Sequence, residues 1–363
     1  MTQTKSIKPE LYFVGPKTDF LFIGGLSLLL FPVLWWVQHS DYFSSFLISL
    51  FYLGVIINFP HFSATVFRLY RSKENMMAFP VTSFVIPIVV LALTLAAFFL
   101  PQLFASVFIL VYFFWSPYHF SGQSTGVTMV YARRNNYRIG KIERLFLSGF
   151  IFSSFLFPVL WLLGSDKTSE HSDLEPLLGY FSGFFDIQIP EWTSVPVGVF
   201  LGISAVGFVI LMMKQAREKG DRFPPLMLFL PAITHFIWFA FSAEMGALAF
   251  IALVPLFHSL QYLYIAWAVQ LKELHKDQAP NKKQAFKDSL SWYGWNVMGG
   301  ALQFLFLPMV FVKIFDVSFF YAFLIVSTGV QVHHFFVDGV IWKLRNPNAL
   351  AALTSNIPKW VQA

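Results

Sequence analysis

The sequence predicts an all-α protein, a polytopic bundle of about ten transmembrane helices that makes residues 1–363 a single membrane domain. Three observations predict this fold. Of the 363 residues, 56% are hydrophobic and only 12% are charged, whereas a soluble domain carries about 25% charged residues. Apolar segments recur along the whole chain, and a spanning helix needs roughly 20 such residues. The connections between these segments alternate between basic and non-basic.

The predicted spans leave no room for a long soluble domain. They lie near residues 20–38, 43–67, 79–100, 103–131, 144–164, 195–213, 224–243, 246–271, 290–314 and 318–342. The longest connection, residues 165–194, contains the stretch GYFSGFFDIQIPEW, for which we expect a short interfacial helix. The N-terminal segment lacks the short basic start followed directly by an apolar run that marks a signal peptide.

Lys and Arg are concentrated in every second connection. For example, the connection LPQ after the third span has none, whereas residues 133–144 after the fourth contain five. Because basic loops stay in the cytoplasm, this alternation predicts that both termini are cytoplasmic. We therefore expect an integral membrane protein, of the cytoplasmic membrane if the source is a bacterium. The net charge of +6 reflects topology, and nucleic-acid binding is not expected.

Histidines recur at one depth of the predicted bundle. Ionisable groups inside a membrane usually face the bundle interior and serve a function. At about 1.5 Å per helical residue, five spans carry a histidine roughly 10–20 Å from their predicted cytoplasmic ends. These residues are His61, His119, His235, His258 and His334, and His333 adjoins the last of them.

Four of these histidines have polar residues on the same helix face, at spacings of three, four or seven. The aligned groups are Asn58, His61 and Thr65; Ser116, His119 and Gln123; His258, Gln261 and Tyr262; and Ser327, Gln331, His334 and Asp338. Polar stripes on four helices at a common depth predict a buried polar site inside the bundle.

Neutral imidazole suits iron, zinc, copper and nickel, and a carboxylate adds preference for harder ions. Because the chain has no cysteine, thiolate metal sites and disulfides are excluded. The predicted metal ligands are His61, His119, His258 and His334, with His235, His333 and Asp338 as further candidates. Iron is the first choice of metal, and zinc, copper or a single haem held between facing histidines are the alternatives.

Metal-bound histidines commonly donate their second ring N–H to a neighbouring polar group. The residues placed to support the ligands in this way are Asn58, Gln123, Gln261, Tyr262 and Gln331. His333 and His334 point about 100° apart on one helix, and His334 is the predicted ligand because it shares its face with Gln331 and Asp338. Asp338 could instead pair with Lys343 or Arg345 at the membrane edge.

Two short stretches carry a family resemblance. NFPHFSAT around His61 and LFHSLQYLYIAW around His258 resemble two motifs of the Brp/Blh family of membrane β-carotene 15,15′-dioxygenases, a Pro-His-Gly stretch and a His-Ser-x-x-His stretch. The resemblance implies a multispan bundle, an iron centre with His61 and His258 as ligands, and oxygen-dependent cleavage of a carotenoid to retinal. Phe62 stands where the family has glycine, and Tyr262 stands where it has the second histidine. The HH pair near the end is similar to membrane desaturases and hydroxylases, whose HxxxH and HxxHH spacings are absent.

The leading hypothesis is a metal-dependent membrane oxidoreductase of the oxygenase, dioxygenase or desaturase type. Its partner would be a lipophilic small molecule, an isoprenoid or an acyl chain, held among membrane lipids. An ion- or proton-coupled transporter that uses the His/Gln/Asp cluster is the alternative from another class. A structural membrane protein with a polar packing core is the third. The sequence leaves a redox partner and a homo-oligomer open.

Overall fold

The computed structural model describes residues 11–164, 189–275, 281–344 and 347–354, and within these ranges the chain forms helices and turns without a strand. In the described ranges, ten helical units are long and apolar enough to cross a membrane, which confirms the predicted all-α, ten-span bundle. They are Pro16–Val37, Phe43–Tyr70, Val81–Phe99, Pro101–Arg134, Lys141–Trp161, Glu191–Glu218, Leu226–Glu244, Ala249–Leu274, Lys282–Phe315 and Phe319–Ile341. The cytoplasmic position of both termini stays a prediction.

Burial identifies the helices at the centre of the bundle. The apolar stretch of Ala249–Leu274 is 78% buried, and those of Leu226–Glu244 and Phe319–Ile341 are 61% buried. By contrast, Glu191–Glu218 and Lys282–Phe315 are only 17% buried and present most of their apolar side chains outward. Since a bilayer is the medium that tolerates such an apolar outer surface, the chain is an integral membrane protein.

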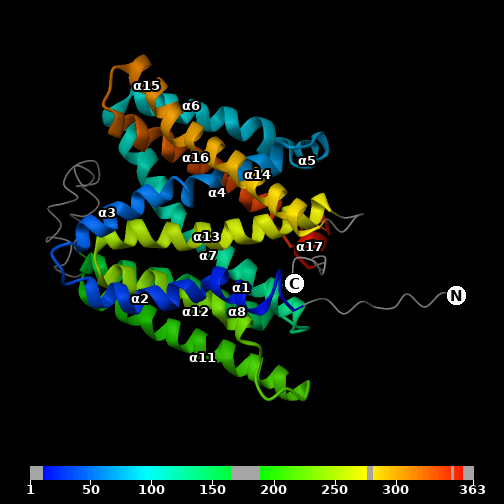
Figure 1. The fold of residues 1–363 in the computed structure, drawn as a ribbon. Helices are drawn as coiled ribbons and strands as arrows, with labels where there is room; N and C mark the ends of the chain where they lie inside the picture. The colour runs from blue at the N-terminus through cyan, green and yellow to red at the C-terminus, as the bar shows by residue number, and fades with distance from the viewer. Residues whose placement is uncertain (1–10, 165–188, 276–280, 345–346, 355–363) are drawn as a thin grey trace.

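The histidine cluster described below is carried by helices α4, α7, α13 and α16. Their bounds are Asn58–Tyr70, Ser106–Arg134, Ala247–Leu274 and Phe319–Ile341. In Figure 1, α13 and α4 run across the middle of the bundle, with two groups of helices on opposite sides of them. The site therefore lies where the two groups meet.

One flanking group packs around α16 and α4. It consists of α5 (Lys73–Ala78), η2 (Val81–Val85), α6 (Ile86–Phe99), η3 (Pro101–Ala105), α14 (Lys282–Ala301), η7 (Leu302–Phe306) and α15 (Leu307–Phe315). Helix α14 begins eight residues before the predicted span. Its N-cap is Asn281, whose side chain accepts a hydrogen bond from the Gln284 N–H at 2.8 Å. Capped and rich in polar residues, this first part of α14 forms helix without needing a bilayer.

The other flanking group packs around α12. It consists of α1 (Pro16–Phe20), η1 (Leu21–Gly25), α2 (Leu26–Val37), α8 (Lys141–Gly164), η6 (Glu191–Thr193), α11 (Ser194–Glu218) and α12 (Leu226–Glu244). Helix α3 (Phe43–Gly54) contacts α13, and α17 (Pro347–Thr354) contacts α7 and α13. The interfacial helix expected in GYFSGFFDIQIPEW lies mostly outside the described residues; of that stretch, η6 contains only its last residues.

The buried carboxylate of Asp19 fixes the N-terminal segment that precedes helix α1. It accepts hydrogen bonds from the N–H groups of Phe13 at 2.6 Å and Val14 at 3.0 Å. The phenol groups of Tyr131 on α7 and Tyr264 on α13 also donate to it. With this many donors the buried carboxylate is fully satisfied, and it ties the start of the chain to two central helices.

Candidate metal centre

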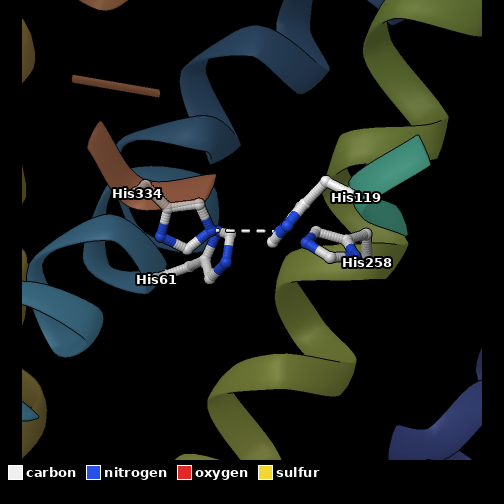
Figure 2. Close-up of side chains that lie close together, drawn as sticks. All are labelled: His61, His119, His258 and His334. Atoms are coloured by element: carbon white, nitrogen blue, oxygen red, sulfur yellow. Dashed lines mark hydrogen bonds between the residues drawn. The ribbon is translucent and has the colours of Figure 1, made fainter. Parts of the chain in front are cut away.

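Four histidines from four different helices meet in the middle of the bundle. They are His61 from α4, His119 from α7, His258 from α13 and His334 from α16, and one ring nitrogen of each lies within 4.8 Å of the others. Figure 2 shows the four rings pointing toward one another. Three of the residues are 1% exposed, whereas the His119 side chain is 9% exposed.

The four rings form a closed cycle of edge-to-face contacts. Going round from His61 to His258, His119 and His334, adjacent ring centroids lie 5.0, 5.0, 4.8 and 4.3 Å apart. The planes of each pair cross at 70–81°. The Nε2 atoms of His334 and His119 lie 3.2 Å apart (Figure 2). Because the rings touch one another directly, no macrocycle fits between them, which argues against the haem alternative.

Prolines lie close to three of the four cluster histidines along their helices. A proline precedes the histidine by one, two or three residues on three of the four helices: Pro60 before His61, Pro117 before His119 and Pro255 before His258. Pro117 and Pro255 lie inside their helices, where a proline removes a backbone hydrogen bond and bends the helix. Pro60 lies in the first turn of α4, where it is tolerated.

His61 is oriented by a short chain of hydrogen bonds. The Ser259 hydroxyl donates to Oδ1 of Asn58 at 2.7 Å, and it lies 3.1 Å from Nδ1 of His61. Since the hydroxyl proton is used on Asn58, the serine oxygen accepts from an N–H at Nδ1. His61 is thereby held as the tautomer whose Nε2 carries the lone pair, and in the described structure that Nε2 has no hydrogen-bond partner.

Of the four histidines, His258 has the greatest need of a further partner for its ring nitrogens. A neutral imidazole has one N–H donor and one acceptor nitrogen. Within the described part of the chain, neither ring nitrogen of His258 has a hydrogen-bond partner, and the residue is 1% exposed. Leaving a buried polar group unpaired costs about 1–3 kcal/mol. A bound metal ion would take up one of these nitrogens.

Asp338 turns one carboxylate oxygen toward the cluster. Its Oδ2 lies 3.4 Å from Nε2 of His334 and 3.8 Å from Nε2 of His119. Its Oδ1 accepts hydrogen bonds from the hydroxyls of Thr65 and Tyr262, both at 3.1 Å. Asp338 thus lies with the histidines, and its ionic contacts in the described structure are to His334 and His119 and not to Lys343. The other alternative partner, Arg345, falls outside the described residues.

The three glutamines do not hold the imidazoles as expected. Gln123 donates to the backbone carbonyl of His258 at 3.1 Å and to Oε1 of Gln261 at 2.9 Å. Gln261 in turn donates to the carbonyl of Ile23 at 2.6 Å, inside the π-helical turn η1. Gln331 faces the Tyr112 hydroxyl on α7. The expectation of direct amide–imidazole bonds is therefore wrong, because nearby backbone and hydroxyl groups take these amides.

Tyr262 and Asn58 do lie at the cluster. The Tyr262 ring packs edge-to-face on His61, with centroids 4.4 Å apart, and its hydroxyl accepts from Nε1 of Trp342 at 3.0 Å. Asn58 reaches His61 only through Ser259. Sequence reasoning missed Ser259, although a hydroxyl residue directly after an intramembrane histidine was the available signal.

His235 and His333 stand apart from the cluster. His235 on α12 has a serine hydroxyl at each ring nitrogen, Ser121 at 3.2 Å from Nε2 and Ser124 at 3.1 Å from Nδ1. The His333 ring stacks on Tyr70, with its Nε2 3.5 Å from the phenol oxygen. His334 lies in the cluster, whereas the His333 ring lies against Tyr70 of α4, outside the cluster.

The donor set fits one transition-metal ion. Metal–imidazole bonds of about 2.0–2.1 Å put two ligand nitrogens of one ion at most about 4.2 Å apart. The observed limit of 4.8 Å exceeds this by roughly 0.6 Å, a gap that small side-chain rotations close. Four neutral nitrogens and one carboxylate oxygen are ligands that iron accepts readily.

Comparison with known proteins finds no match to a protein-family model, a curated protein or a solved structure. The resemblance to the Brp/Blh family therefore stays a prediction based on the residues around His61 and His258.

Proposed function

We propose that this chain is a membrane metalloenzyme that binds one ion, iron by preference, through the four clustered histidines and oxidises or cleaves a lipophilic substrate. The observation that supports this most is His258, a buried imidazole that lies beside three others and whose two nitrogens have no partner in the described part of the chain. Asp338 would be a fifth ligand or would accept a proton near the ion. We expect the protein in the cytoplasmic membrane of a bacterium.

The donor types support iron over the other metals. Closed structural zinc sites use four ligands in a tetrahedron, and thiolates are their common partners. Here the carboxylate of Asp338 lies beside four imidazoles, and such mixed nitrogen and oxygen donor sets are typical of non-haem iron. Bound iron would supply oxygen activation, which is the chemistry that the resemblance around His61 and His258 also implies.

Phenylalanine rings pack against three of the four histidines. Phe120 packs on His258 with centroids 4.3 Å apart, Phe62 on His334 at 4.7 Å, and Phe335 on His119 at 4.7 Å. These rings exclude water from the site and offer contacts to a hydrocarbon. A dry site suits oxidation of an isoprenoid or acyl chain because it protects reactive species from side reactions with water.

Hydrogen bonds between the helices favour a fixed site over the site of an alternating-access transporter. Gln123 and Gln261 link α7, α13 and η1 through buried hydrogen bonds next to His258. In transporters the helices that hold the site move against each other. Breaking this network during each cycle would leave buried amides without partners, at about 1–3 kcal/mol for each group.

The proposal is tested with protein purified in detergent, loaded with Fe(II) and supplied with isoprenoid and acyl lipids under ¹⁸O₂. We expect ¹⁸O in a lipid product from the wild type and none from His258→Ala. His235→Ala is the matched control and should keep the activity. Iron binding without ¹⁸O incorporation, together with ion flux in reconstituted vesicles, would favour the transporter and overturn the enzyme.

A further inference from the structure

A tyrosine and a tryptophan link the histidine cluster to one end of the bundle. The Tyr262 ring on α13 packs edge-to-face on His61, with centroids 4.4 Å apart. The Trp342 ring, directly after α16, packs edge-to-face on Tyr262 at 5.8 Å, and its Nε1–H donates to the Tyr262 hydroxyl at 3.0 Å. Direct contacts therefore lead from the cluster through Tyr262 to Trp342.

Trp342 lies at the edge of the bundle and is only partly buried. The Arg68 guanidinium of α4 lies over the indole, 4.3 Å from the ring centroid. Glu273 of α13 pairs with Arg68 at 3.2 Å and offsets its charge, and these two side chains are 16% and 15% exposed. Lys343, the residue after the indole, is exposed. The chain of rings thus ends within reach of a molecule outside the bundle.

The chemistry of Tyr262 differs from that of the other rings described on the cluster. Those rings belong to Phe62, Phe120 and Phe335. Tyrosine and tryptophan lose an electron far more readily than phenylalanine, because the phenol oxygen and the indole nitrogen stabilise the oxidised ring. Electrons also pass readily between rings in van der Waals contact. Tyr262 and Trp342 therefore offer a route for single electrons, which the three phenylalanines do not.

The hydroxyl of Tyr262 has an acceptor for its proton. Oxidation makes a phenol strongly acidic, so a buried tyrosine gives up an electron readily only where its proton can move to a neighbouring group. Tyr262 is 4% exposed, and its hydroxyl donates to Oδ1 of Asp338 at 3.1 Å. Thr65 lies 2.5 Å from the same hydroxyl and 3.1 Å from the same Oδ1. The phenol proton can therefore cross one hydrogen bond and return.

We propose that Tyr262 and Trp342 form an electron relay that supplies the cluster with single electrons from a one-electron carrier protein at the Arg68 end of the bundle. Tyr262 gives one electron to the oxidised metal centre, and its proton moves to Oδ1 of Asp338. Trp342 then reduces the tyrosyl radical, and the proton returns to the phenol oxygen. The carrier finally reduces the indole cation. One electron passes from the carrier to the centre, and the number of protons on the chain is unchanged.

This inference rests on the proposed function and deepens it, because it names a partner and narrows the reaction. Oxygen-dependent cleavage by a dioxygenase takes its electrons from the substrate alone, whereas hydroxylation or desaturation also consumes electrons from a separate reductant. The 363 residues contain no cysteine, so they hold no thiolate-bound iron–sulfur cluster or dithiol that could store these electrons. A relay to the edge of the bundle thus favours hydroxylation or desaturation of the lipophilic substrate.

The test oxidises the outer end of the relay with light and uses the metal-free protein. Because the chain has no cysteine, Lys343→Cys provides a single attachment point for a ruthenium–bipyridyl photo-oxidant beside Trp342. After a flash in the presence of a diffusible electron acceptor, the ruthenium(III) complex takes an electron from the protein. Transient absorption and electron paramagnetic resonance should show a tryptophan radical that decays as a neutral tyrosyl radical forms.

Two variants in the labelled protein locate the radicals. Tyr262→Phe should leave only the tryptophan radical. Trp342→Phe keeps an aromatic ring in place and should slow formation of the tyrosyl radical by an order of magnitude or more. Trp267→Phe is the matched control and should leave the rate unchanged, because Trp267 is a partly buried indole on α13 whose Nε1–H donates to Ser289 at 2.9 Å.

A further substitution keeps the hydrogen bonds of the relay intact. 3-Fluorotyrosine incorporated at position 262 retains the hydroxyl and should add fluorine splitting to the radical spectrum, which identifies the site even if Tyr262→Phe does not fold. A tyrosyl spectrum without this splitting would overturn the inference. Equally fast radical formation in a folded Trp342→Phe variant, or no tyrosyl radical in the folded labelled protein, would overturn it as well.

Iron binding, measured on the same labelled protein, separates this inference from the proposed function. With Fe(II) bound, the tyrosyl radical should be short-lived and Fe(III) should form as it decays. Iron binding without any tyrosyl radical in the metal-free sample would overturn the relay and leave the metal site standing. A radical at Tyr262 in a folded protein that binds no iron would contradict the proposed function and leave the electron route standing.

Discussion

Two buried histidine environments in this bundle differ in one respect. The cluster around His258 and the site of His235 are both enclosed, and both residues are at most 1% exposed. His235 has a serine hydroxyl at each ring nitrogen, whereas His258 has other imidazoles around it and, among the described residues, no hydrogen-bond partner for either nitrogen. The difference shows that burial alone does not mark a metal ligand. In the described structure, unpaired ring nitrogens from three helices lie in a group of four histidines that could hold a metal ion, and His235 has no such surroundings.

Removing an imidazole of the cluster should have the largest effect. His258→Ala should weaken Fe(II) affinity by more than about 100-fold, since even loss of an outer partner costs 10–100-fold. Competition with a chromophoric chelator under anaerobic conditions measures the affinity. His258→Ala that binds iron as tightly as the wild type would erase the distinction between the two environments.

Removing the hydroxyl that orients a ligand should have the next largest effect. Ser259→Ala leaves Nδ1 of His61 without its acceptor, so we expect iron affinity to fall about 10–100-fold. The same chelator competition applies. Ser242→Ala is the matched control, because Ser242 is equally buried and lies on α12, and it should leave the affinity unchanged.

The paired histidine should matter for stability and not for metal. His235→Ala leaves the Ser124 hydroxyl without its imidazole, whereas Ser121 keeps its bond to the Pro117 carbonyl. We expect a stability loss of about 1–3 kcal/mol, with the iron affinity unchanged. Denaturant titration in detergent and the chelator assay measure the two quantities. Loss of iron with intact folding would place His235 in the metal site.

The smallest effect is expected at His333. His333→Phe keeps a ring stacked on Tyr70 and removes only a long contact of 3.5 Å. Stability should change by less than about 1 kcal/mol, as for a weak hydrogen bond, and iron affinity should not change. A large drop in affinity would mean that His333, and not His334, supplies the fourth nitrogen.

Composition and loop charge predicted the fold because a bilayer accepts few architectures. Hydropathy found every span, but it placed the start of α14 too late, because polar residues such as Lys283 extend this helix beyond its apolar part. The break between α3 and α4 and the π-helical turns were not predicted. They depend on packing between helices, for example the contact that Gln261 makes with the carbonyl of Ile23.

The depth of the histidines along their helices predicted the cluster. The polar helix faces that they share with neighbouring residues distinguished the four cluster histidines from His235. His235 lies at the same predicted depth as His258, but its neighbours one turn away are apolar, with Pro231 before it and Phe239 after it. His235 was nevertheless kept as a further metal candidate, because its depth alone was used. The serines that satisfy His235 come from α7, and no spacing within α12 could reveal them.

The hydrogen-bond partners of the glutamines could not be predicted from the sequence. Gln123 and Gln261 share helix faces with His119 and His258, which predicted bonds to the rings. Long amide side chains instead reach backbone carbonyls one helix away. Which acceptor an amide finds is decided by the rotation of neighbouring helices, and that rotation is a property of the packed bundle.

The central claim is tested most directly by X-ray absorption spectroscopy on the iron-loaded, full-length protein, with total metal measured on the same sample. We predict about one ion for each chain and nitrogen or oxygen neighbours near the 2.0–2.2 Å typical of such ligands, with scattering from four imidazoles. The same spectrum should be obtained from His235→Ala. A folded protein that binds no transition metal, or a spectrum without imidazole scattering, would contradict the account.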